Sequence, residues 1–138
     1  MDRIEFSNKL VKARENAGCG KNEMCRRTGF TFVQLQRIEQ AANSYNMSLP
    51  LKYLNAINYH ICVSDNGQQY KITSNDDLVS FLVQLRTGRM TQRQLSEACG
   101  RSFVAIANLE RKNSIASIDT FLSIVNALNL KVEMYYGE

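Results

Sequence analysis

The feature that most constrains this chain is an internal repeat. When the 138-residue sequence is displaced by 71 residues, its second half falls on its first. Matching residues then coincide along the repeat: Gly29 with Gly100, Phe32-Val33 with Phe103-Val104, Leu35 with Ile106, Ile38 with Leu109, Glu39 with Glu110 and Leu51 with Leu122. Before residue 20 the displacement becomes 72, because one residue is missing from the first loop of the second copy. Such a repeat of apolar positions indicates two copies of one small folding unit.

Each copy is expected to be a series of short helices. Apolar residues recur at helical spacing, which predicts one inward face per helix. Gly29 and Gly100 predict a tight turn, because glycine adopts a positive φ most easily. After the helix that follows this turn, we expect Asn43 and Asn113 to take the left-handed conformation. The expected N-terminal residues of the helices are Asp2 and Ser74, then Thr31 and Ser102, then Ser48 and Ser117.

The segment after the last helix of each copy alternates like a β-strand. We expect strands over residues 60–64, 68–73 and 131–136, with Asp65-Asn66-Gly67 as a hairpin turn. The hairpin is the natural boundary, so the expected organisation is a first unit at 1–64, a connector at 65–73 and a second unit at 74–138.

Composition narrows the class of protein. The net charge of +4 and the pI of about 9.0 fit a nucleic-acid partner. The charged start and the absence of any apolar run near ~18 residues predict neither a secretory signal nor a membrane helix, so we expect a cytoplasmic protein. The four cysteines and the single histidine do not cluster, and no carboxylate pair, Ser-His arrangement or phosphate loop is visible. We therefore expect no metal, no cofactor and no enzymatic activity.

One segment of the second copy carries a recognisable motif. It comprises Leu85-Arg86, Thr91-Gln92-Arg93-Gln94-Leu95-Ser96, Gly100-Arg101-Ser102-Phe103-Val104-Ala105-Ile106 and Leu109-Glu110-Arg111. This segment resembles the Cro/phage-repressor (Xre) helix-turn-helix family, and the first copy carries a weaker version of it. The resemblance implies a mainly α fold of two tandem five-helix, lambda-repressor-like domains. It also implies that the helix after the glycine turn enters the major groove of DNA.

The resemblance also assigns site residues. Base contacts are expected from Phe32, Val33 and Arg37 in the first copy and from Phe103, Val104 and Asn108 in the second, with Gln36 beside them. Arg37 is suited to guanine and Asn108 to adenine, and the Phe and Val side chains to thymine methyl groups. In the family, the residue equivalent to Gln92 contacts a phosphate, and Lys21 is its counterpart in the first copy. The remaining expected DNA contacts are Thr31, Arg93, Ser102, Arg111 and Lys112.

Two features of this motif have structural interpretations. The resemblance implies that Arg14 with Glu39, and Arg86 with Glu110, form partly buried ion pairs that fix helix geometry. The Phe-Val pair at the start of each third helix has two alternatives to thymine contact, which are a protein interface and plain core packing.

The sequence therefore predicts a DNA-binding transcriptional regulator whose partner is double-stranded DNA. Its two helix-turn-helix units are expected to act as a pseudo-dimer within one chain, or else in a homodimer. The strands after the last helices resemble those of Xre-type antitoxins, which pair across their dimer. The resemblance therefore implies that residues 60–64, 68–73 and 131–136 form one small antiparallel sheet between the copies. The alternative is accordingly an antitoxin-type or other protein-interaction module that no longer reads DNA and binds a toxin or another protein.

Overall fold

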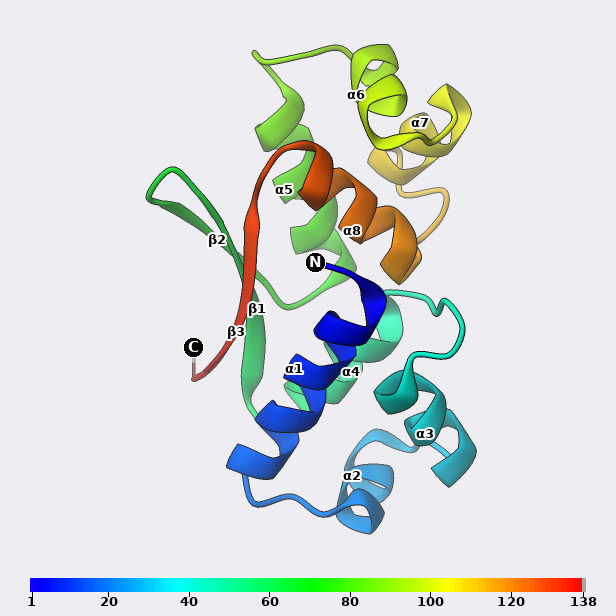
Figure 1. Cartoon of the computed structure of the whole chain (residues 1–138), viewed down its shortest axis with the longest axis vertical. Coiled ribbons are helices and arrows are strands. Elements are labelled where there is room, and N and C mark those ends of the chain that lie inside the picture. Colours follow the sequence, from blue (N-terminus) through cyan, green and yellow to red (C-terminus); the bar gives the residue numbers. More distant parts are fainter. Residues whose placement is uncertain (138) are drawn as a thin grey trace.

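The computed structural model describes residues 1–137, which are mainly helical with one three-stranded antiparallel sheet (Figure 1). The first half contains α1 (Arg3–Asn16), α2 (Lys21–Thr28), α3 (Phe32–Gln40) and α4 (Ser48–Asn55). The second half contains α5 (Asn75–Arg86), α6 (Gln92–Cys99), α7 (Phe103–Glu110) and α8 (Ile118–Ala127). The strands are β1 (Tyr59–Asp65), β2 (Gln68–Ile72) and β3 (Lys131–Tyr136). The displacement that aligns the two sequences therefore also aligns α1–α4 with α5–α8.

Each half forms four helices within the described residues, and the fifth that we expected is not formed. The chain instead turns after α4 and α8 directly into β1 and β3. Asn58 (φ 59°) and Asn129 (φ 55°) occupy equivalent positions in these turns, where the left-handed conformation ends the helical segment. The strand therefore begins where a further helix would have started.

Local sequence signals account for most helix ends. The side chains of Asp2, Thr31, Ser74, Ser102 and Ser117 each accept a hydrogen bond from the backbone N–H three residues later, as expected of N-caps. Gly29 (φ 79°) and Gly100 (φ 71°) take the predicted left-handed turn.

The prediction for Asn43 and Asn113 is wrong. Ala41 (φ 54°) and Lys112 (φ 62°) adopt the left-handed conformation instead. The reason is that the chain leaves α3 and α7 before it reaches either asparagine. In the first copy Ala41 is the C-cap of α3, and its backbone N–H still bonds to the carbonyl of Arg37.

The sheet has the strand order β2-β1-β3, with both pairings antiparallel, which confirms the sheet predicted between the copies. Asn66 (φ 48°) and Gly67 (φ 88°) form the two-residue turn between β1 and β2, where both central residues need a positive φ. Ile61, Val63, Ile72 and Val132 are buried. One chain therefore supplies both the first copy's strand and the second copy's strand that pairs with it.

The pairing of β1 with β3 has two-fold symmetry with respect to the repeat. Cys62 pairs with Glu133, and these two residues are equivalent under the displacement of 71. On either side of them, Ile61 pairs with Met134 and Val63 pairs with Val132, so that each pair is the image of the other. A local two-fold axis therefore passes through the Cys62–Glu133 pair.

The same symmetry holds where the loops after α3 and α7 meet. Asn46 forms a β-bridge with its own equivalent, Ser117. The Met47 N–H donates to the Ala116 carbonyl at 2.9 Å, and the Ile118 N–H donates to the Tyr45 carbonyl at 2.7 Å. Under the displacement of 71 residues these two bonds exchange. Two separate main-chain contacts between the halves thus obey one two-fold relation.

A continuous hydrophobic core joins the two halves. It includes residues of the first copy, such as Phe6, Leu35 and Tyr53, and residues of the second, such as Leu82 and Phe121. The Phe6 and Phe121 rings pack edge to face across the repeat, with centroids 6.4 Å apart.

Glu138, the last residue of the expected second unit, lies outside the described residues. Among the helices of residues 1–137, none is long and apolar enough to cross a membrane.

Candidate nucleic-acid interface

The two helices that follow the glycine turns, α3 and α7, lie toward opposite ends of the molecule and on the same side of it (Figure 1). The sheet lies on the other side. Each helix packs its inner face, with Leu35 and Ile38 in α3 and Ile106 and Leu109 in α7, into the core. Their first turns are left open to solvent.

The Phe-Val pair at the start of each of these helices is exposed. Phe32, Val33, Phe103 and Val104 retain between 40% and 64% of their accessible surface, and they are among the most exposed large apolar side chains of the described residues. They are therefore not core residues, which removes one of the three interpretations of this pair. Thymine contact and a protein interface remain.

A cation lies over the phenyl ring in both copies. The Arg93 guanidinium carbon is 5.0 Å from the centre of the Phe103 ring, and the Lys21 ammonium is 5.9 Å from the centre of the Phe32 ring. Both cations come from the first turn of the preceding helix, α6 or α2. The attraction of a cation to an aromatic face holds a positive charge beside each apolar pair. Sequence reasoning did not find this contact, although both partners were named separately.

The other expected contact residues differ in their exposure and in whether their side chains already have a partner. Arg37 and Arg111 are exposed, while Gln36 and Asn108 are half-buried. Thr31 and Ser102 are exposed N-caps whose side-chain oxygens accept the N–H groups of Gln34 and Ala105. Lys112 forms an exposed ion pair with Asp76 at 2.9 Å. Its ammonium group therefore has a partner within the chain, at the surface, and its contact with DNA stays a prediction.

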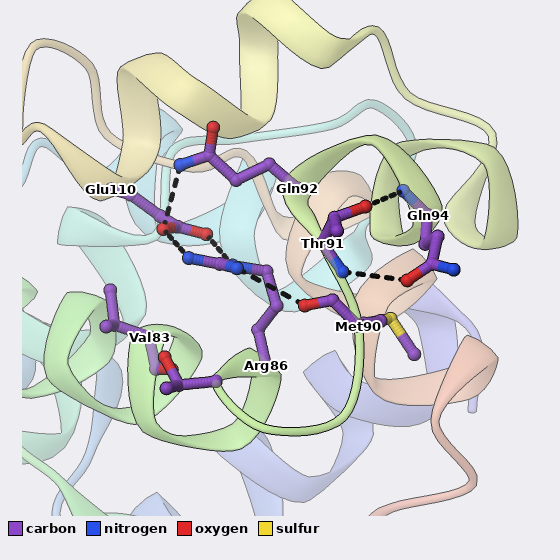
Figure 2. Close-up of polar contacts among 8 residues, drawn as sticks. Val83, Arg86, Met90, Thr91, Gln92, Gln94 and Glu110 are labelled. Atoms are coloured by element: carbon purple, nitrogen blue, oxygen red, sulfur yellow. Dashed lines mark hydrogen bonds and ion pairs between the residues drawn. The ribbon is translucent and has the colours of Figure 1, made fainter.

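Glu110 organises the base of the second helix pair (Figure 2). Its carboxylate accepts hydrogen bonds from Arg86 Nε and Nη2 at 2.6 and 2.8 Å, and from Gln92 Nε2 at 3.0 Å. Arg86 Nη1 also donates to the Met90 carbonyl at 3.3 Å. Burial opposes ionisation of Glu110, but the hydrogen bonds from Arg86 and Gln92 outweigh it and lower the pKa of the carboxyl. The group therefore clamps α5, the start of α6 and the end of α7 together.

The structure gives Gln92 an intramolecular contact besides the phosphate contact that was expected of it. Its side-chain amide is directed at Glu110 rather than outward (Figure 2). Thr91 and Gln94 complete a reciprocal capping box beside it, with hydrogen bonds of 2.9 and 3.1 Å. The start of α6 is therefore rigidly held. Its first-turn N–H groups, which have no intrahelical acceptor, are the part of it suited to an anion.

The first copy builds the equivalent ion pair with a different third member. Glu39 accepts hydrogen bonds from Arg14 Nε and Nη2 at 2.7 and 3.3 Å, and from the Tyr53 hydroxyl at 2.6 Å. Burial opposes the charge of Arg14, but Glu39 outweighs it and raises the pKa of the guanidinium. Burial and then the bond to Glu39 raise the pKa of the Tyr53 hydroxyl, which keeps it protonated and donating. Both predicted ion pairs are thus formed.

Tyr53 was missed by sequence reasoning. It sits at a position where the second copy has Ile124, so the repeat presents it as a core residue. The exchange has a consequence at the surface. Because Tyr53 supplies the third hydrogen bond in the first copy, the residue equivalent to Gln92 is released from that task. That residue is Lys21, whose ammonium lies over the Phe32 ring.

Formal charge is unequally divided between the copies. Residues 1–64 carry nine Lys and Arg against five Asp and Glu, whereas residues 74–138 carry seven of each. The net positive charge therefore belongs to the copy whose motif is weaker.

Comparison of the chain with protein-family models, with curated proteins and with solved structures finds no match.

Proposed function

We propose that this protein is a sequence-specific DNA-binding transcriptional regulator, built from two repressor-type helix-turn-helix domains that act as a pseudo-dimer in one chain. The domains would be residues 1–64 and 74–138, joined by the hairpin at 65–73. One observation carries the proposal. Two equivalent helices, each entered through a left-handed glycine, expose their first turns on the same side of a molecule whose halves obey a local two-fold relation.

The placement of α3 and α7 on one side of the molecule supports this proposal. A recognition helix fits the major groove, and two-fold related helices address half-sites about one helical turn apart on one face of DNA. The cations held over Phe32 and Phe103 favour an anionic partner, because a protein interface of the usual kind has few charges at its centre. The proposal implies that the protein acts in the cytoplasm and binds its DNA there.

The experiment is a selection of bound duplexes from a random pool, followed by gel-shift titration of the selected duplex between 50 and 200 mM salt, a range over which phosphate contacts weaken steeply. We expect the logarithm of the affinity to fall linearly with the logarithm of the salt concentration. Light scattering on the free protein should report a monomer, because β3 pairs with β1 of its own chain.

A pair of variants tests whether the surface formed by the first turns of α3 and α7 binds DNA. Val104→Glu places a carboxylate on the exposed start of α7, and we expect it to weaken binding of the selected duplex at least tenfold. Tyr136→Glu is the matched control, because Tyr136 is 71% exposed and lies on β3, away from α3 and α7 (Figure 1). Equal losses from the two variants, or an affinity that does not depend on salt, would exclude binding of DNA through this face.

The alternative function is an antitoxin-type or other protein-interaction module. The observation that favours it is the exposed Phe-Val pair, because neither side chain can hydrogen-bond a base edge. Two results together would support this alternative. The selection would enrich no duplex, and Val104→Glu would abolish binding of a purified protein partner such as a toxin.

A further inference from the structure

We infer that the two halves read unlike half-sites, so that the protein binds an asymmetric operator in one orientation, with Arg37 and Asn108 as the residues that set the asymmetry. The inference rests on the proposed function and adds the form of the site that is read.

Arg37 and Asn108 occupy the same place in the two-fold arrangement. Each is the sixth residue of its helix, five positions after the Phe that opens α3 or α7, and the displacement of 71 superposes them. Within the described residues, neither side chain has a hydrogen-bond or ion-pair partner. Both are therefore available to a ligand on the side where α3 and α7 lie.

The chemistry of these two side chains differs. Arginine offers only donors, in a planar fork that matches the O6 and N7 acceptors of guanine. Asparagine offers a donor and an acceptor side by side, which match N7 and N6 of adenine. Because the two residues are related by the two-fold relation, they face corresponding base pairs in the two half-sites. Those base pairs are then guanine in one half and adenine in the other.

The Phe-Val pair predicts where the two half-sites agree. Phe32-Val33 and Phe103-Val104 are identical in sequence, similarly exposed and similarly accompanied by a cation. They present the same apolar side chains to both half-sites, although the cation is Lys21 in the first copy and Arg93, at a non-equivalent position, in the second. The operator is therefore a pseudo-palindrome, in which positions opposite these pairs repeat and the position opposite residue 37 or 108 does not.

Orientation follows because the halves belong to one chain. A homodimer presents the same residue to both half-sites, so turning it around on the duplex changes nothing. In this protein, a turn by 180° would place Arg37 on adenine and Asn108 on guanine. Each mismatched contact of this kind reduces affinity by roughly tenfold to a hundredfold, so one orientation dominates.

The test is the selection of bound duplexes with exchanged residues. The wild-type protein should enrich an asymmetric site. Arg37→Asn should enrich a symmetric site with adenine at both positions, and Asn108→Arg should enrich one with guanine at both. Each single variant should bind the wild-type site roughly tenfold to a hundredfold more weakly. The double exchange Arg37→Asn/Asn108→Arg should recover most of that loss, because the protein reverses on the duplex.

The controls separate sequence reading from charge and folding. Arg37→Lys keeps the charge but loses the planar fork, so it should lose preference at that base while keeping affinity for random duplex. The double exchange leaves net charge unchanged. Because Asn108 is half-buried, circular dichroism must show that Asn108→Arg folds, and Arg37→Asn alone carries the test if it does not.

The outcomes distinguish the inference from the function beneath it. If the wild-type protein enriches a perfect palindrome, or if Arg37→Asn leaves the asymmetry unchanged, the inference is overturned while DNA binding stands. If no duplex is enriched by any of these proteins, the proposed function fails and the inference fails with it.

Discussion

Arg14→Met should destabilise the protein by about 4 kcal/mol. The side chains of Arg14 and Glu39 are 9% and 7% exposed, so the substitution leaves a buried carboxylate with only the Tyr53 hydroxyl as a donor. Removing one member of a buried ion pair costs about 3–5 kcal/mol. The loss is large against a total stability of about 5–15 kcal/mol for a domain of ordinary size.

Urea unfolding followed by circular dichroism at 222 nm measures this loss, since the chain is mainly helical and has no tryptophan. With a slope of about 2 kcal/mol per molar urea, the midpoint should fall by about 2 M. We expect a single transition, because one core spans both copies. Arg86→Met should cost about 1 kcal/mol less, because the Arg86 side chain is 18% exposed against 9% for Arg14, while each carboxylate keeps one other donor.

The double variant Arg14→Met/Glu39→Leu identifies the source of the loss. If the stranded carboxylate is responsible, removing it should restore more than half of the lost stability. A double variant as unstable as Arg14→Met would mean that the packing of Arg14, or its bond to the Cys19 carbonyl, is what matters. A midpoint within about 0.3 M of wild type for Arg14→Met itself would refute the reasoning, since it would show that the pair contributes little.

Three further predictions use the same measurement. Tyr53→Phe should cost about 1.5–3 kcal/mol, the contribution of a hydrogen bond to a charged group, whereas a change under 0.5 kcal/mol would show that Glu39 needs no third donor. Gly100→Ala should cost about 1–2 kcal/mol from its left-handed φ of 71° alone, because no atom lies within 4 Å of an added Cβ; an unchanged midpoint would mean that the turn relaxes. The pKa of the Glu110 carboxyl is lower in the folded protein than its ordinary value of 4.5, so the ionised group stabilises the folded protein fully above pH 4.5. This stabilisation is lost as the pH falls through the lower folded-state pKa. As the pH is lowered below 4.5, the urea midpoint of the wild-type protein should therefore decrease more steeply than that of Glu110→Gln. Parallel decreases in the two proteins would contradict this assignment.

Features set by neighbouring residues were predictable from the sequence. The N-caps at Thr31 and Ser102, the glycine turns and the Asn66-Gly67 hairpin each depend on a few adjacent positions. The alternation of residues 60–64 and 131–136 predicted the strands themselves, whereas their pairing between the copies came from the resemblance to antitoxin strands. The ion pairs came from the family resemblance, and the structure forms both of them.

Features set by contacts between distant positions were not predictable. Tyr53 occupies an apolar position of the repeat, and only its distance from Glu39 reveals that its hydroxyl completes the ion pair. The resemblance gave Gln92 a phosphate contact, and nothing in the sequence indicated that its amide also reaches Glu110 eighteen residues away. The left-handed residues after α3 and α7 were placed on asparagines by propensity, whereas the actual helix ends selected Ala41 and Lys112. For Tyr53 and Gln92 the partner of the side chain was unknown, and for the left-handed residues the end of the helix was unknown.

The register of β1 against β3 also affects how the protein responds to dilution. When two separate chains assemble through such strands, the assembled fraction falls as the concentration falls. Here the connecting chain holds Cys62 and Glu133 at a fixed effective concentration, so the pairing persists in a single molecule. Whatever the two exposed helices bind, occupancy should rise with the first power of protein concentration, with no threshold for assembly and no exchange of subunits with a relative.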